Sequence, residues 1–298
     1  MYRLSHYTTP AGLEGIATSR TLWATNFRTV EDRSELFYAW KILSRAALAY
    51  VVERVPADLI PDFVDPTDEQ LAEEYRRELD ASEHYGHLFM ASFVRHGTED
   101  EERRGSLTHW RTFSKLNGYC LQFDDADIRL LIDLDTWRSS YGLIELRPIT
   151  YGVNTETGTY RELVIQLGRH QLQEVAKQLA DRRIKFDLEG CWAPSHLLRT
   201  MMQYCASHKD PSFKDEREVR IMAFPVNATT VQFLTGAAFA KPISSRPDGK
   251  RYIALGEGIR PAIGPRRIII GPQANPDIEH IVAKFPERPE ILRSDIPV

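Results

Sequence analysis

Two repeating patterns of hydrophobic and polar residues run along the chain, and each predicts one kind of secondary structure. Short stretches that alternate or run apolar between turn residues are typical of strands. Longer stretches with a period near 3.6 residues are typical of helices buried along one face. The predicted strands are 1–8, 21–25, 87–94, 118–123, 144–151, 218–224, 230–234, 252–255, 267–270 and 290–292. The predicted helices are 11–20, 34–52, 65–84, 162–182, 194–207 and 278–285.

The order of these elements predicts the fold class. No internal repeat, low-complexity tract or Pro/Gly/Ser-rich linker divides the 298 residues. We therefore predict a single α+β domain over residues 1–298, with a mixed, mostly antiparallel sheet and flanking helices. A helical segment, 156–208, is predicted to be inserted between two groups of strands, and the charged segment 95–104 is predicted to be a loop.

Composition narrows the class of protein further. With 42% hydrophobic and 27% charged residues, the chain has the composition of a folded globular protein. The net charge of −4 does not indicate nucleic acid or an anionic membrane as a partner, although a local basic groove stays open. The 3 cysteines share no CxxC spacing, which favours reduced thiols. Because no signal-peptide pattern or long apolar run is present, we expect a cytoplasmic protein without a membrane partner.

Polar residues beside predicted strands are the candidates for chemistry. Ser5-His6-Tyr7-Thr8 offers an imidazole and a ring that can stack on a planar ligand, although local satisfaction within a strand is equally expected. Trp110-Arg111 could cover a pocket and bind a phosphate, but a structural Trp beside an ion-paired Arg is the commoner case. Asp32 and Glu35 stand where acidic residues complement a helix dipole, and we favour that role.

The charged run around Glu216 and Glu218 is the strongest acidic candidate. Alternate residues of a strand share a face, so Glu216, Glu218 and Arg220 are expected to point the same way. Two carboxylates on one face could stabilise a developing positive charge, whereas a solvated, salt-bridged strand is the commoner outcome. The sequence contains no phosphate-binding glycine loop, nucleophile elbow, HExxH or Cys/His zinc pattern, and no metal site is predicted.

These clusters, in this order, resemble the bacterial family named domain of unknown function 2971 (DUF2971). The resembling motifs are His6-Tyr7-Thr8, Leu22-Trp23-Ala24-Thr25, Asp32-Arg33-Ser34-Glu35, Ser92-Phe93, the block from Ser106 to Phe113 with Gly118, the block from Phe213 to Arg220, Ile268–Pro272 and Ser294–Pro297. The chain departs from the family pattern at His109, Phe113 and Val219, where Gln, Tyr and Trp are usual.

The polar pattern of this family is similar to that of ADP-ribosyltransferases, and the resemblance implies a role for each candidate residue. Glu218 would stabilise positive charge at the ribose of NAD, the implied substrate, and Glu216 would orient or deprotonate the acceptor. In the other predicted roles, His6 binds a ribose hydroxyl, Tyr7 or Trp23 flanks the nicotinamide, Arg111 holds the pyrophosphate, and Thr8 and Trp110 complete the binding site. The resemblance further implies an ADP-ribosyltransferase-like fold, a nucleic-acid or protein acceptor, and a toxin or anti-phage defence role with an antitoxin or defence partner.

Two other functions stay open on the residues alone. Asp124, Asp125 and Asp127, or Asp133 and Asp135, could bind Mg²⁺ in a defence nuclease, although the first set suits the start of a helix. Alternatively, the same polar clusters would form a non-catalytic module that binds a nucleotide or a partner.

Overall fold

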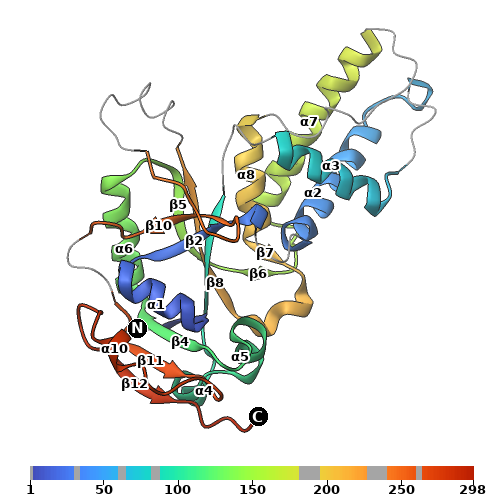
Figure 1. Ribbon diagram of the computed structural model, residues 1–298. Helices are drawn as coiled ribbons and strands as arrows, with labels where there is room; N and C mark the ends of the chain where they lie inside the picture. Colours follow the sequence, from blue (N-terminus) through green and yellow to red (C-terminus); the bar gives the residue numbers. More distant parts are fainter. Residues whose placement is uncertain are drawn as a thin grey trace. The chain divides into compact units, whose positions relative to one another are not determined.

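The chain folds as two units in the computed structural model, one built on a β-sheet and one on helices (Figure 1). The first unit comprises Met1–Val30, His87–Ile149 and Asp215–Val298, and the second comprises Glu31–Gly86 and Thr150–Lys214. The structure describes residues 3–29, 34–59, 65–81, 88–180, 195–226, 240–259 and 264–298. The prediction of one domain over 1–298 therefore stays a prediction, and the predicted strand 230–234 lies outside the described residues.

A mixed, mostly antiparallel sheet forms the first unit, which confirms the predicted α+β class. Its strands are β1 (Arg3–Thr8), β2 (Leu22–Asn26), β3 (Phe89–Val94), β4 (Tyr119–Asp124), β5 (Tyr141–Pro148), β8 (Glu218–Pro225), β9 (Ser244–Ser245), β10 (Arg251–Leu255), β11 (Arg267–Ile270) and β12 (Glu290–Arg293). Only the pairing of β11 with β12 is parallel among these described strands.

Strand β3 is the branch point of the sheet. Along one edge it pairs with β8 over its whole length, from Phe89↔Ala223 to Val94↔Glu218. Its other edge is shared by two strands, because β1 pairs with it at Ser5↔Val94 and β2 pairs with it at Met90 and Phe89. Strands β1 and β2 therefore diverge along β3, and the middle of β3 is left facing the gap between them.

The first unit buries its main core on one face of this sheet. Alternate residues of β3, β4, β8 and β11 point into this core, where they meet α1 (Pro10–Ser19), α6 (Asp125–Arg138) and α10 (Glu279–Val282). Helix α1 begins with Pro10 at its first position, and Thr9 caps it by accepting a hydrogen bond from the Gly12 amide. On the opposite face a smaller cluster gathers around Trp110 of α5 (Leu107–Ser114).

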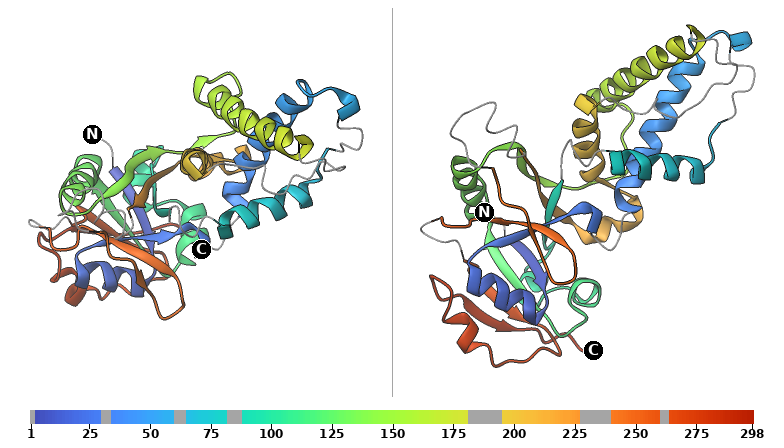
Figure 2. Two further views of the ribbon diagram at one scale, coloured as in Figure 1. Left: turned by 90° about the horizontal axis from the view of Figure 1, so that it is seen from above. Right: turned by 45° about the horizontal axis from the view of Figure 1, so that its top comes forward.

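Helices form most of the second unit. They are α2 (Ser34–Val52), α3 (Asp68–Ala81), α7 (Gly158–Ala180) and α8 (Ser195–Ala206), accompanied by the parallel pair β6 (Thr150–Tyr151) and β7 (His208–Lys209). Figure 2 shows α2 lying along α7. Because α2 packs on α7 and α8, this unit contains the segment Glu31–Gly86 in addition to the predicted insert 156–208. No helix within the described ranges is long and apolar enough to cross a membrane.

The charged segment before α5 differs from its prediction. Residues Glu99–Arg104 form helix α4 instead of a loop. Thr98 caps this helix by accepting from the Glu101 amide, four acidic residues occupy its first turn and two arginines its last. All six residues of the segment are charged, so hydrophobic periodicity could not reveal the helix.

Candidate active site at the split in the sheet

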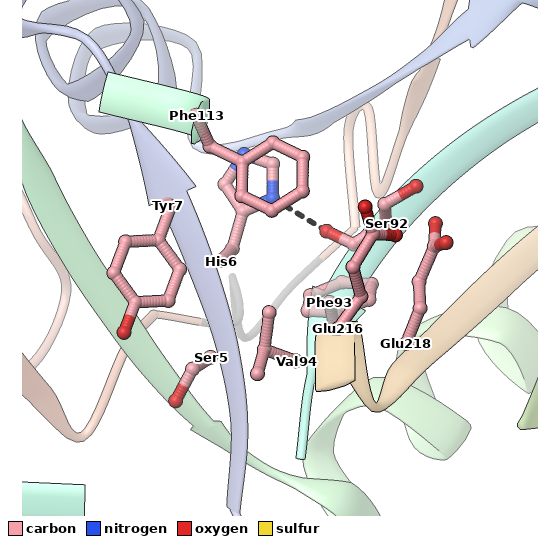
Figure 3. A pocket seen from close by; sticks show the side chains of 9 residues that line it. All are labelled: Ser5, His6, Tyr7, Ser92, Phe93, Val94, Phe113, Glu216 and Glu218. Atoms are coloured by element: carbon pink, nitrogen blue, oxygen red, sulfur yellow. Dashed lines mark hydrogen bonds between the residues drawn. The ribbon is translucent and has the colours of Figure 1, made fainter. Parts of the chain in front are cut away.

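A cavity of about 230 Å³ lies where β1 and β3 separate. Of the described residues, those lining it are Ser5, His6, Tyr7, Ser92, Phe93, Val94, Phe113, Glu216 and Glu218 (Figure 3). All of them belong to the first unit. The cavity thus brings together four of the eight site residues predicted from the sequence, namely His6, Tyr7, Glu216 and Glu218.

His6 bridges the split between the two strands. Its Nδ1 lies 2.9 Å from the main-chain oxygen of Ser92, and its ring lies 5.7 Å from that of Phe93 (Figure 3). A carbonyl oxygen only accepts, so Nδ1 carries the hydrogen, which leaves Nε2 of the neutral ring as an acceptor. Burial lowers the pKa of His6, and the Ser92 carbonyl opposes this in part. The imidazole is therefore neutral near pH 7.

Glu218 is held by a buried guanidinium. Arg220 donates from Nε to Oε1 at 2.6 Å and from Nη2 to Oε2 at 2.8 Å. The two residues are 5% and 2% exposed, respectively. Such a two-point, charge-assisted contact fixes the plane of the carboxylate and favours its ionised form. Glu218 therefore enters the cavity wall as an oriented carboxylate.

Glu216 lines the cavity, but it does not lie on the strand that was predicted to carry it. The expectation that Glu216, Glu218 and Arg220 share a strand face holds only for the last two, which lie in β8. Glu216 is the last residue of the 3₁₀ helix η4 (Pro211–Glu216). Arg217 has a φ of 46°, in the left-handed region, so the chain turns sharply between the two glutamates. The prediction was wrong because strand alternation does not extend across this turn.

An ion pair fixes the turn at Arg217. Its Nη1 and Nη2 lie 2.7 Å from Oε2 and Oε1 of Glu101, and Glu101 Oε2 also accepts from the Gly97 amide at 2.8 Å. Hydrogen bonds from Arg217 lower the pKa of Glu101. The Arg217 carbonyl accepts from the Arg95 amide at 3.0 Å. The left-handed conformation of Arg217 is costly for a residue other than Gly. It is stabilised here by hydrogen bonds of both the side chain and the main chain of Arg217.

Tyr7 joins the cavity to a buried polar network behind it. Its hydroxyl accepts from the Ser106 amide at 2.9 Å and lies 2.9 Å from His96 Nε2. The Tyr7 hydroxyl and His96 Nε2 therefore share one hydrogen bond, and His96 Nδ1 faces the Ser5 hydroxyl at 3.4 Å. Burial, together with nearby His109, lowers the pKa of His96 to about 4. His96 was not among the residues predicted from the sequence, and its position after β3 gave no signal of this contact.

His109 supports both Tyr7 and the glutamate turn. Its ring stacks on Tyr7 at 5.4 Å and on Phe113 at 5.9 Å, and its Nε2 donates to the Glu216 carbonyl at 3.0 Å. The other nitrogen, Nδ1, is buried without a hydrogen-bond partner among the described residues. Burial lowers the pKa of His109, which keeps the ring neutral. The departure from the family pattern at this position therefore lies against the cavity wall.

The remaining predicted site residues lie outside the cavity lining. Thr8 is buried at the end of β1, and Trp110 is fully buried, with its Nε1 donating to the Arg104 carbonyl at 3.1 Å. Trp23 stacks on Tyr252 with ring centroids 4.6 Å apart. Arg111 is exposed on α5, the helix that carries Phe113. Their predicted roles in cofactor binding stay predictions.

Four of the five aspartates of the nuclease hypothesis, Asp124, Asp125, Asp127 and Asp135, contact a cation or an amide. Asp125 pairs with Arg129 at 2.8 Å, and Asp127 pairs with Arg266 at 2.9 Å. Asp135 is buried with Lys241 at 2.8 Å and also accepts from the Gly256 amide. Asp124 occupies the N-cap position of α6, as the sequence indicated, although its side chain makes no capping hydrogen bond. In the part of the chain that the structure describes, no three His, Cys, Asp or Glu residues form a group that could hold a metal ion.

The fold and the cavity define an α+β protein with a carboxylate-lined site at a split in its sheet. Residues 109–221 match the model of a family described as a protein of unknown function, DUF2971. This match confirms the predicted resemblance to that family, and it includes Phe113, Glu216 and Glu218 of the cavity. No curated protein and no solved structure matches the chain.

Proposed function

We propose that this chain is an ADP-ribosyltransferase-like enzyme that cleaves NAD and transfers ADP-ribose to a macromolecule. The observation that carries the proposal is the meeting of His6, Tyr7, Glu216 and Glu218 on one cavity. These residues are far apart in the sequence, in β1 and at the turn that joins η4 to β8. A toxin or anti-phage defence role, with a nucleic-acid or protein acceptor, belongs to the same proposal and rests on the family resemblance.

Glu218 supports the bond-breaking step of this reaction. When the bond between ribose C1′ and the nicotinamide nitrogen breaks, its electron pair leaves with nicotinamide and positive charge develops at the sugar. A carboxylate that is already oriented stabilises this charge without reorganising, and Arg220 orients Glu218 through two hydrogen bonds. The acceptor oxygen or nitrogen then bonds to C1′ and gives up a proton.

Glu216 and His6 suit the two remaining tasks. Glu216 takes the acceptor proton as a general base, since it lines the same cavity from the other side of the Arg217 turn. His6 accepts a hydrogen bond from a ribose hydroxyl through Nε2, because Nδ1 is already bound to Ser92. Tyr7, Phe93 and Phe113 provide aromatic surface for the nicotinamide ring.

The test is release of nicotinamide from NAD by the purified protein, with and without total cellular RNA. We expect release by the parent chain and a loss of at least about 100-fold in Glu218→Gln, because the substitution removes the negative charge that stabilises the transition state. Glu257→Gln, at an exposed turn of the same unit, is the matched control and should retain activity.

Folding must be verified, because Glu218→Gln leaves the buried Arg220 without its carboxylate. Glu216→Gln is therefore a second variant, at a half-buried position, and it should lower transfer to an acceptor more than it lowers NAD cleavage. Full activity in a folded Glu218→Gln protein would contradict the proposal. Dependence of release on RNA would identify the class of acceptor.

A non-catalytic binding module is the second candidate. The observation in its favour is that both oxygens of Glu218 already accept hydrogen bonds from Arg220. Binding of NAD without any nicotinamide release, in the presence of RNA or protein acceptors, would support this function instead.

A further inference from the structure

We propose that strand β5 is a docking edge for a second copy of this chain, whose own β5 adds antiparallel to it and forms a weak dimer. The inference goes beyond the proposed function, because no step of NAD chemistry enters it. It rests on the length of this sheet edge, on the direction of its outer main-chain groups and on its pattern of charges.

Strand β5 is the longest of the three terminal strands of the described sheet. Strand β9 has two residues, and β12 has four and lies against helix α4. Strand β5 has eight residues and lies beside β8, its only partner among the described strands (Figure 1). None of the eight residues of β5 is buried, whereas seven of the eight in β8 are. A long exposed edge of this kind is a template for the addition of another strand.

The pairing of β5 with β8 shows which main-chain groups point outward. The Ile149 amide donates to the Glu218 carbonyl at 2.9 Å, so every second residue back along β5 also directs its main chain to β8. The amides and carbonyls of Ile144, Leu146 and Pro148 therefore point away from β8, except that Pro148 has no amide hydrogen. In the part of the chain that the structure describes, no strand pairs with this outer edge.

Two features confine further pairing to the middle of β5. A register shift between Tyr141 and Leu143 distorts the start of the strand, and Pro148 cannot donate at its end. Antiparallel addition centred on Leu146 uses the groups between them. The two copies of Leu146 exchange both of their hydrogen bonds, and each Ile144 amide donates to the Pro148 carbonyl of the other copy. Because this interface is short, the dimer is weak.

The charges of β5 favour the same register. Glu145 and Arg147 share one face of the strand, their side chains are 30% and 49% exposed, and Arg147 Nη1 lies 3.6 Å from Glu145 Oε1. Centring on Leu146 places each Glu145 directly opposite Arg147 of the other copy. A shift of the centre by one residue would place Glu145 opposite Glu145, or Arg147 opposite Arg147. Like charges directly opposite destabilise a strand pair, so β5 is complementary to itself when centred on Leu146.

The test is sedimentation equilibrium of the full chain between about 1 µM and 1 mM, the range of weak complexes. We expect the parent chain to dimerise in this range. Glu145→Arg gives β5 two positive charges and Arg147→Glu gives it two negative charges, so each variant alone should associate at least about tenfold more weakly. An equimolar mixture of the two variants should recover the association, because each Arg then lies opposite a Glu.

Arg288→Glu is the matched control. It reverses an exposed charge of the same unit, outside β5, and should leave the dimer unchanged. Circular dichroism verifies folding, since both test variants also lose the contact between Glu145 and Arg147 within one strand. Arg147→Glu, at the more exposed position, is sufficient by itself to test the charge pairing if Glu145→Arg does not fold.

A parent chain that stays monomeric up to 1 mM would overturn the inference. A dimer that persists unchanged in the charge-reversed variants would do the same, because it would form at another surface. A mixture of two folded variants that does not associate would also contradict pairing through β5.

Discussion

Three histidines lie at the cavity or in contact with Tyr7, which lines it. Burial makes each of these histidines a weaker base. The pKa values of His6, His96 and His109 are all lowered, with burial as the largest cause. His6 and His109 each donate one hydrogen bond to a carbonyl, and His96 Nε2 shares one with the Tyr7 hydroxyl. The site therefore combines uncharged imidazoles with two glutamates, of which Glu218 is ion-paired with Arg220.

His96 should make folding stability depend on pH. The ordinary pKa of 6.5 applies to the unfolded chain, and the folded value is about 4. Between pH 6.5 and about pH 4, His96 is protonated in the unfolded state but not in the folded state, so its burial lowers the free energy of unfolding as the pH falls. Below about pH 4 this effect does not increase further. The whole effect is about 3 kcal/mol, and above pH 6.5 it vanishes.

The measurement is urea unfolding at pH 7 and pH 5 for the parent and for His96→Gln. We expect the variant to lose less stability on acidification than the parent does. His280→Gln removes an exposed histidine of the same unit and should leave the pH dependence unchanged. An identical pH dependence in the parent and His96→Gln would contradict the buried, neutral state of His96.

Close packing between α5 and the sheet depends on the glycine immediately before β4. A Cβ atom added at Gly118 would lie 2.2 Å from the Thr8 carbonyl oxygen and 2.4 Å from Ser114 Cβ. Gly118→Ala should therefore lower the free energy of unfolding by about 1–3 kcal/mol through overpacking. Chemical denaturation measures this change.

Gly15→Ala is the matched control for this substitution. Within helix α1, the added Cβ would make an ordinary contact of 3.5 Å with the Trp23 ring. Alanine is also the better helix former, so this variant should gain up to about 1 kcal/mol. If both substitutions had the same sign, close packing at Gly118 would not be the cause.

Elements with a clear hydrophobic period were predictable from the sequence, and those fixed by distant contacts were not. The apolar stripe of α2 gave its bounds, Ser34–Val52, and the apolar run of β11 gave Arg267–Ile270. Helix α4 was missed because its stability comes from capping and charge. The sharing of one edge of β3 between β1 and β2 is a property of pairing across the chain, which local periodicity does not encode.

Only part of the candidate site could be predicted from the sequence, because the rest depends on contacts between distant residues. His6, Tyr7 and the two glutamates were found because polar residues stood at strand ends in a familiar order. The turn between Glu216 and Glu218 was not foreseen, because Arg217 adopts a positive φ that a sequence suggests only for Gly or Asn. The contact of His96 with Tyr7 joins residues 89 positions apart and was likewise hidden.

Two buried thiols allow each unit of the molecule to be followed separately. Cys120 lies in the first unit and Cys205 in the second, both fully buried. Burial raises the pKa of Cys120 to about 12 and also raises that of Cys205. Both thiols should therefore be protected from thiol reagents while their units are folded.

We expect native protection of at least about 1,000-fold relative to the unfolded chain, as for a domain of ordinary stability. The measurement is pulsed alkylation and peptide mass spectrometry in increasing urea, in a Cys191→Ser background. Labelling of both thiols over one urea range would support a single domain, and separate ranges would indicate two. Rapid labelling of Cys120 in the absence of urea would contradict its burial.

The contact between His6 and Ser92 has a consequence for how this site can vary. The imidazole is bound to a main-chain oxygen, so the orientation of His6 does not depend on which side chain stands at position 92. The exposed side chain there can change the wall of the cavity while the histidine keeps its tautomer. The position of the imidazole is thus set by the backbone of the sheet. Relatives can therefore differ at position 92, and so in ligand preference, while the imidazole stays in place.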